Sequence, residues 1–298
     1  MEHHGSSSSP SSHNAPITKV PPFTPEAEFY SYVARGYDQT ASTYDLVEGR
    51  NAISERVRRT TIDAALATFK EGDLVLELGC GTGRDAIEMA LNGIRVVATD
   101  VSPQMVSSTI ARARREGVGA LVTVKSAPAV LAAREGGPYD GVYSNGAVLN
   151  LEPDLLGVAA GMRETLRSGG HAVLTVANRI SLFELAVYPI ALRPRKAFRK
   201  LGATVPIPIS REGLGKRYVV PTRFLTPREF RGIFGRGFDL ESTRALQAIT
   251  PPWNFVDMAS RFHAAVGPLE RIEDRFGSGW ILRNLGAIYL MILRRMEV

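Results

Sequence analysis

Three glycines and one aspartate in this chain have residue types and a spacing suited to ligand binding. Gly79, Gly81 and Gly83 follow an apolar run that starts at Val75. Glycine permits a sharp turn and a close approach of the backbone to a ligand, and a helix expected directly after the turn offers free N–H donors. Asp100 ends a second expected strand, at about the distance where a doubly wound sheet holds a ribose. These features predict an adenosine-type cofactor over the carboxyl ends of two neighbouring strands.

The rest of the turn narrows the class of cofactor. A nicotinamide-binding turn has Gly or Ala at its sixth position, and here that position is Arg84. The segment Glu77–Gly83 instead resembles the first motif of the class I, Rossmann-like S-adenosylmethionine-dependent methyltransferases. Further segments are similar to the second motif, the fourth strand, the turn into the fifth strand and the helical lid of small-molecule members: Val96–Met105, Tyr139–Asn145, Leu166–Leu174 and Tyr37–Asp45.

This resemblance implies S-adenosyl-L-methionine as the cofactor and assigns residues to it. Many members hold the adenine with an acid just after the third strand, but Lys125–Pro128 contains no carboxylate. Adenine recognition is therefore expected from backbone groups or from Ser126. The expected cofactor contacts are Tyr37, Tyr44, Glu77, Gly79, Cys80, Gly81, Gly83, Asp100, Val101, Met105, Ser126, Ala127 and Asn145.

Methyl transfer from a sulfonium is an in-line displacement, so the protein mainly has to align nucleophile and methyl. A base is required only for a poorly acidic nucleophile. Asn145, after the fourth expected strand, and Glu184, after the fifth, are the candidate catalytic residues. The alternatives are a turn-forming role for Asn145 and a solvated or ion-paired helix position for Glu184. No group of His, Cys and Asp has metal-ligand spacing, so no metal is expected.

Alternating strand and helix signals predict an α/β protein with a doubly wound, mostly parallel, seven-stranded sheet. Residues 1–22 read as a disordered tail and 23–298 as the methyltransferase domain. Within it we expect a helical lid at 23–70, a cofactor-binding core at 71–178 and a cap of helices at 179–236, between strands five and six. Residues 237–298 hold the final strands with a helical insertion.

The cap concentrates positive charge. Between Arg179 and Arg236 thirteen Arg or Lys stand against three acids, a net charge of +10, whereas the whole chain carries +6. Arg193, Arg195, Lys196, Arg199 and Lys200 recur at helical spacing. Such a face attracts an anionic substrate, a membrane surface or RNA, or is simply solvated.

The composition indicates the cellular compartment and the kinds of partner to expect. The single cysteine excludes a disulfide within the chain, which fits a reducing, cytoplasmic location. No apolar run is long enough to span a membrane, although peripheral membrane contact stays open, and the oligomeric state is not specified. The sequence predicts methylation of a small molecule, of an amphipathic, anionic or lipid-like kind. The alternatives are an RNA methyltransferase using the basic cap, although no recognition module for nucleic acid is visible, and a cofactor-binding module without transfer activity.

Overall fold

A computed structural model describes residues 26–297, apart from 203, 210–216, 256–260 and 262. The predicted tail therefore lies outside the described residues. A seven-stranded sheet has the order β3-β2-β1-β4-β5-β9-β8. Its strands are β1 (Leu74–Leu78), β2 (Arg95–Asp100), β3 (Val122–Ser126), β4 (Tyr139–Ser144), β5 (Leu166–Ala177), β8 (Phe238–Leu246) and β9 (Ile288–Arg295).

The strand directions confirm the predicted sheet. Strands β1 to β5 pair in parallel, and β9 runs antiparallel between β5 and β8. β1 lies between β2 and β4, so the strand order reverses beside β1. In open α/β sheets ligands bind outside the carboxyl ends of the strands at such a reversal.

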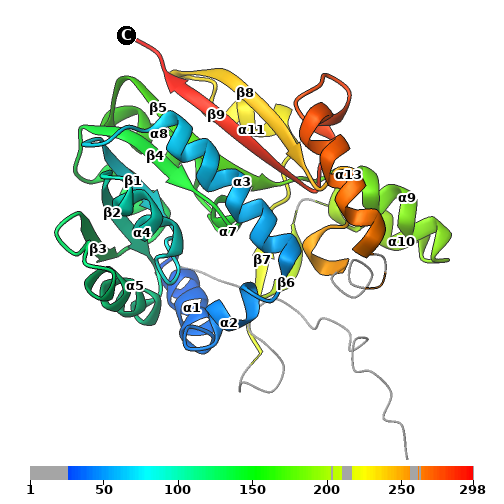
Figure 1. The fold of residues 1–298 in the computed structure, drawn as a ribbon, viewed down its shortest axis with the longest axis horizontal. Helices are drawn as coiled ribbons and strands as arrows, with labels where there is room; N and C mark the ends of the chain where they lie inside the picture. Colours follow the sequence, from blue (N-terminus) through cyan, green and yellow to red (C-terminus); the bar gives the residue numbers. More distant parts are fainter. Residues whose placement is uncertain (1–25, 203, 210–216, 256–260, 262, 298) are drawn as a thin grey trace, which may run out of the picture.

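Helices cover both faces of the sheet, each over its own apolar core (Figure 1). One face carries α3 (Ala52–Thr68), α4 (Arg84–Leu91) and α5 (Pro103–Arg115). The other carries α6 (Ala129–Arg134), α8 (Leu155–Thr165) and α11 (Pro227–Phe234). A parallel sheet needs this double cover because both of its faces are apolar. Among the described residues, no helix combines the length and the apolar character that a membrane crossing requires.

The N-terminal lid consists of α1 (Glu26–Asp38), α2 (Tyr44–Glu48) and the start of α3. α1 continues through a buried Gly36 and ends at Asp38. Two carboxylates fasten the lid to the core. Asp38 accepts hydrogen bonds from the Ser102 hydroxyl (2.5 Å) and the Gln104 N–H (3.1 Å) at the start of α5. Asp45 accepts from the Thr82 hydroxyl (2.5 Å) and pairs with Arg112.

The cap lies between β5 and β8, as predicted, but it is not purely helical. It starts with α9 (Leu182–Ile190), α10 (Pro194–Ala197) and the 3₁₀ turn η1 (Arg199–Leu201), and then forms a two-stranded antiparallel sheet of β6 (Val205–Pro208) and β7 (Val219–Thr222). Both short strands combine β-branched residues with proline, which fits an isolated ribbon. The remaining elements are α7 (Val148–Leu151), η2 (Trp253–Phe255), α13 (His263–Phe276) and η3 (Leu282–Asn284).

A buried carboxylate joins α13 to the loop that follows β8. Glu273 is 3% exposed and accepts hydrogen bonds from the backbone N–H groups of Gln247, Ala248, Ile249 and Thr250, at 2.8–3.3 Å. The same carboxylate accepts the Thr250 hydroxyl. Four converging N–H donors satisfy a buried charge without a cation, so this contact fixes the loop.

We expect Glu273→Gln to destabilise the protein, because the amide NH₂ would face N–H donors that now lack an acceptor. A hydrogen bond to a charged group contributes about 1.5–3 kcal/mol. The free energy of unfolding, measured in urea, should therefore fall by at least about 1.5 kcal/mol. Glu270→Gln is the matched control on the same helix, since Glu270 makes only a half-exposed pair with Arg56 (3.5 Å) and such pairs contribute less than about 1 kcal/mol. Equal losses in the two variants would contradict the assignment.

Candidate active site

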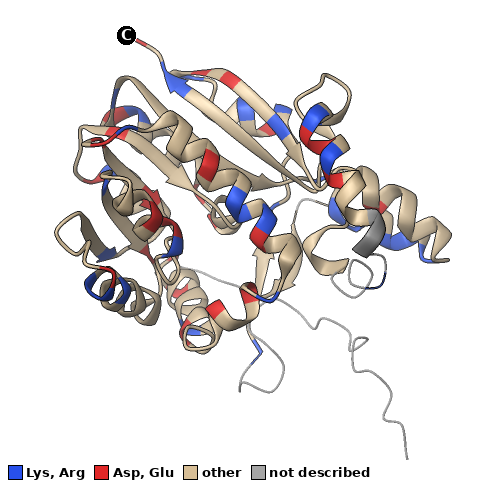
Figure 2. Ribbon diagram, in the orientation of Figure 1, with Lys and Arg blue, Asp and Glu red and all other residues tan. Residues whose placement is uncertain are grey.

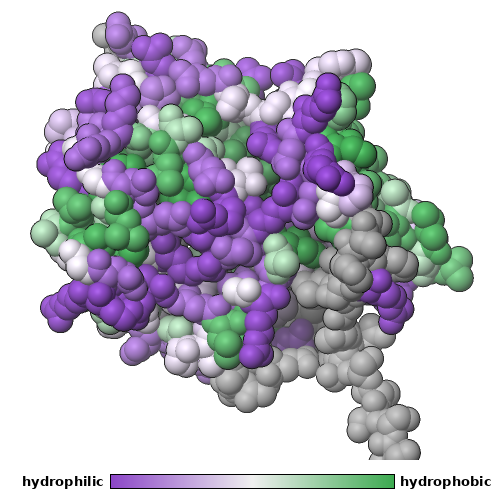
Figure 3. Space-filling model, viewed as in Figure 1, coloured by the Kyte–Doolittle hydropathy of each residue, from purple (hydrophilic) through white to green (hydrophobic). Residues whose placement is uncertain are grey.

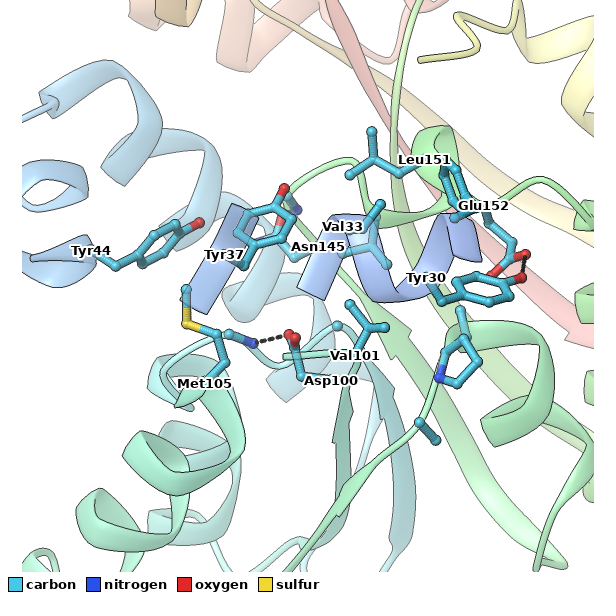
Figure 4. A pocket seen from close by; sticks show the side chains of 18 residues that line it. Tyr30, Val33, Tyr37, Tyr44, Asp100, Val101, Met105, Asn145, Leu151 and Glu152 are labelled. Atoms are coloured by element: carbon cyan, nitrogen blue, oxygen red, sulfur yellow. Dashed lines mark hydrogen bonds between the residues drawn. The ribbon is translucent and has the colours of Figure 1, made fainter. Parts of the chain in front are cut away.

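Two adjoining cavities lie at the carboxyl ends of β1, β2 and β4, under the lid. They contain about 740 and 1,610 Å³ of empty space, counting the part open to solvent. Figure 4 shows the smaller one, with lid side chains over Asp100. Residues lining both cavities mark where they meet: Tyr37, Tyr44, Gly79, Gly81, Asn145, Gly146 and Leu151.

Asp100 is held in place by backbone donors. Its Oδ2 accepts from the Gly81 N–H and its Oδ1 from the Ser102 N–H, both at 2.9 Å. Burial raises the pKa of this carboxyl, and the two N–H donors oppose that shift. Each oxygen keeps a lone pair toward the smaller cavity, so the carboxylate is arranged to accept two further hydrogen bonds, as a ribose would offer.

The three glycines of the turn have different roles. All have positive φ, but only Gly81 faces open space, with no atom within 4 Å of where a Cβ would lie. A Cβ on Gly79 would collide with Val148, and one on Gly83 with Thr109 of α5. Gly83 lines neither cavity, so its expected ligand contact is replaced by a packing role between α4 and α5. Gly81 is the position where the backbone leaves room for a ligand.

Lid and core side chains complete the smaller cavity. Tyr37 and Tyr44 lie over it, and Val101 and Met105 line its wall (Figure 4). Burial is the largest cause that raises the pKa of both phenols. These hydroxyls therefore stay neutral at neutral pH and are able to donate hydrogen bonds.

At the far end of the cavity the structure departs from the prediction. Ser126 is exposed and lines neither cavity, whereas Ala127, Pro128 and Ala129 do line the smaller one. A carboxyl group is present there after all. Glu152 accepts from the Tyr30 hydroxyl (2.5 Å) and from the Val130 N–H (3.3 Å) (Figure 4).

Glu152 was not found from the sequence because it follows the fourth strand, not the third. Its partner Tyr30 is 122 residues away. Burial raises the pKa of Glu152, and the Tyr30 hydrogen bond opposes the shift. No sequence pattern links these residues, so only the folded chain places an acid at this end.

Asn145 lines both cavities, but both the NH₂ and the oxygen of its amide hold structural partners. Its Nδ2 donates to Asp85 Oδ2 (3.1 Å), and its Oδ1 accepts from the Thr175 hydroxyl (2.9 Å). Asp85, which the sequence did not single out, also accepts from the Tyr143 hydroxyl (2.8 Å) and pairs with Arg58 (2.7 Å). This network fixes the end of β4 against α4 and gives Asn145 a positioning role.

Glu77 is a buried acid with an unused oxygen. Its side chain is 3% exposed, and Oε2 has no hydrogen-bond partner within the described part of the chain. Burial raises the pKa well above its ordinary value, and nearby Asp85 and Asp100 add to the shift. Glu77 lines the larger cavity beside Cys80, whose thiol pKa burial also raises. Arg58 and Arg84 line the same cavity but pair with Glu55 and Asp85, so the Oε2 of Glu77 stays available to a cationic ligand.

The prediction that Glu184 faces the cleft is not supported. Glu184 is 3% exposed, lines neither cavity and pairs with Lys200 at 2.9 Å. Burial lowers the pKa of Lys200, and the Glu184 carboxylate opposes this shift. The Lys200 Nζ lies 5.1 Å from the ring centroid of Phe224, which lines the larger cavity. The pair therefore supports the wall from behind and touches no ligand space.

The basic residues of the cap also lie outside both cavities. Among the described residues, Arg58 and Arg84 are the only Arg or Lys that line either cavity. Both pair with Glu55, and Arg58 also pairs with Asp85. The cap instead contributes Ile207, Pro208, Ile209, Thr222 and Phe224 to the larger cavity. The expected recognition of an anionic substrate by the cap is therefore not supported. No three potential metal ligands cluster in the described chain.

Comparison with known proteins finds methyltransferases similar to part of this chain. Residues 75–170 match the family described as "Methyltransferase domain". The chain is 31% identical over 144 residues to a demethylmenaquinone methyltransferase of Beutenbergia cavernae, covering 48% of this chain and 56% of that protein. The chain thus spans about half the length of the curated relatives it matches.

Solved structures share the fold at low identity. A Burkholderia thailandensis 1,6-didemethyltoxoflavin N1-methyltransferase, with its substrate and S-adenosylhomocysteine bound, has a TM-score of 0.55 at 16% identity over 94% of both chains. The [4+2]-cyclase SpnF has a TM-score of 0.59 at 16% identity, covering 89% of this chain and 96% of its own. The fold is that of the Rossmann-like methyltransferases, and it also occurs in a protein described as a cyclase.

Glu77→Gln tests the buried acid without any ligand. A carboxyl whose pKa is raised in the folded state costs folding free energy above its ordinary pKa and none below it. The variant should melt at a higher temperature than the wild type at neutral pH, by about 2–4 °C for each kcal/mol relieved. This gain should vanish as the pH falls below the ordinary value of 4.5. Glu116→Gln, at an exposed ion pair, is the control, and a gain independent of pH would contradict the burial of an unpaired charge.

Proposed function

We propose that this chain, whose residues 75–170 form a methyltransferase domain, transfers a methyl group from S-adenosylmethionine to a small-molecule acceptor. One observation carries the proposal. Gly81 is the only glycine of the turn with open space at its Cβ position, it lines both cavities, and its N–H donates to Asp100. A ligand that spans this junction presents one end to each cavity. Such an arrangement suits a two-substrate transfer.

The described residues fit the cofactor. Asp100 would hold the ribose hydroxyls, Ala127–Ala129 and Glu152 would face the adenine, and the unpaired Glu77 would favour the cationic methionine end. When bound, S-adenosylmethionine supplies an electrophilic methyl group on a sulfonium. Tyr37 and Tyr44, over the junction, would exclude water and donate hydrogen bonds.

The larger cavity indicates an acceptor with an apolar body. Its outer wall carries Ile207, Phe224, Trp253 and Ile288, and its inner end carries the polar network around Asn145. An amphiphile would lie with its apolar part on the cap and its accepting group toward the junction. The acids that line the larger cavity either have structural partners or would face the cofactor, so none is left as a general base. Alignment of the acceptor with the methyl group would therefore account for most of the rate enhancement.

Cofactor binding is tested with three variants titrated calorimetrically with S-adenosylhomocysteine. We expect Gly81→Ala to bind at least tenfold more weakly, because the new Cβ occupies ligand space, and Asp100→Asn to lose about 1.5–3 kcal/mol. Gly83→Ala is the control at the same turn. It should lower the melting temperature, since it collides with Thr109, yet retain affinity at low temperature. Unchanged affinity in both Gly81→Ala and Asp100→Asn would refute the site.

Transfer is tested with labelled S-adenosylmethionine and fractionated metabolite extracts. We expect label in small apolar products, and Asn145→Ala should lower kcat/KM by at least tenfold because the junction loses its alignment. Glu184→Gln should lower the melting temperature, since Lys200 loses its partner, while kcat and its pH profile at low temperature stay unchanged. Label in RNA, abolished by Gly81→Ala, would overturn the small-molecule acceptor. Cofactor binding without label in any fraction would support a module without transfer activity.

A further inference from the structure

The tip of the cap exposes large apolar side chains. Every residue from Pro189 to Lys196 is exposed. Ile190 is 83% and Leu192 90% exposed, and beyond them Phe198 and Leu201 are each more than half exposed. Figure 3 shows apolar side chains gathered on the end of α9–α10 that projects from the molecule. Scattered exposed apolar residues are ordinary, but four within twelve positions form a patch that calls for a partner.

One residue of this tip also has an unfavourable backbone. Leu192 has φ +56°, a left-handed conformation that favours glycine. It directly follows the end of α9, where its N–H donates to Pro189 O (3.0 Å) and the Arg193 N–H to Tyr188 O (2.8 Å). Glycine would satisfy this helix end with less strain, so stability does not explain an exposed leucine here.

Positive charge surrounds the apolar tip. Arg193, Arg195, Lys196 and Arg199 are exposed between its apolar residues (Figure 2), and no ion pair of the described chain includes any of the four. The opposite ends of the cap are thus chemically different. The tip is basic and apolar toward solvent, whereas β6 and β7 are apolar toward the larger cavity.

We propose that the tip, Pro189–Leu201, docks this protein on an anionic lipid surface. Apolar side chains would enter the boundary between headgroups and acyl chains, while the basic residues contact the anionic headgroups. Charge complementarity favours this occupant: another copy of the chain would bring four like charges to the same place. Stable peripheral binding needs both signals, apolar insertion and basic attraction, and the tip presents both.

The tip is directly linked to the larger cavity. Only three residues separate Leu201 from β6, whose Ile207 and Pro208 line that cavity. Lys200, at the base of the tip, lies over Phe224 on the same wall. A protein docked by this tip would hold its larger cavity next to the lipid surface. The docking itself does not depend on methyl transfer.

Co-sedimentation with phosphatidylcholine vesicles, with and without phosphatidylglycerol, tests the proposal. We expect the full chain to bind only the anionic vesicles, and less as salt is added. Leu192→Gly should weaken partitioning by about tenfold while the melting temperature stays the same or rises, since glycine suits the left-handed position. Arg193→Gln with Arg195→Gln should weaken it by roughly thirtyfold.

Matched controls separate docking from general charge attraction. Leu156→Ser, at a leucine 68% exposed on α8, and Arg114→Gln with Arg115→Gln, on α5, should change partitioning by less than about twofold. Absence of vesicle binding, equal losses in tip and control variants, or a dimer that Leu192→Gly dissociates without vesicle binding would each overturn the proposal. Tip-dependent binding of RNA without binding to vesicles would also overturn it.

Discussion

The structure depends on how it accommodates carboxylates that are buried at one edge of the sheet. An ionised carboxylate taken from water must be compensated by donors or by a cation. Asp100 receives two backbone N–H groups, and Asp85 receives Tyr143, Asn145 and Arg58. Glu77 alone keeps an oxygen without a partner. The edge is thus ordered by its own hydrogen bonds and ion pairs, and among the described residues the free oxygen of Glu77 is left for a cationic ligand.

Much of the fold was predictable because it rests on local patterns. Short apolar strands alternating with helices, and a glycine turn before a helix, specify the parallel sheet and the position of Asp100 from the sequence. The place of the cap follows from the point where this alternation stops, whereas the strand order came from the structure. The hairpin β6–β7 did not follow, because prolines within four-residue strands leave no clear period.

The site was predictable only where the ligand-facing group is part of the motif. Gly81, Asp100, Val101 and Met105 lie at fixed positions relative to the turn, so their places follow from the fold. The structure places Ser126, Gly83 and Glu184 outside both cavities, because exposure, packing and pairing depend on contacts distant in sequence. For the same reason the Tyr30–Glu152 contact could not be predicted, since it joins the lid to the segment after α7.

The cap keeps its positive charge and its cavity-lining residues on two different surfaces. Positive charge counted along the sequence suggests a basic pocket, yet a desolvated cavity tolerates a cation only when it is paired. Lys200 shows this, because it is buried only together with Glu184 and over the Phe224 ring. Arg193, Arg195, Lys196 and Arg199, which have no ion pair among the described residues, stay in solvent, and β6 and β7 face the larger cavity. The residues that make the cap basic therefore face solvent, and what the cap contributes to the larger cavity is largely apolar.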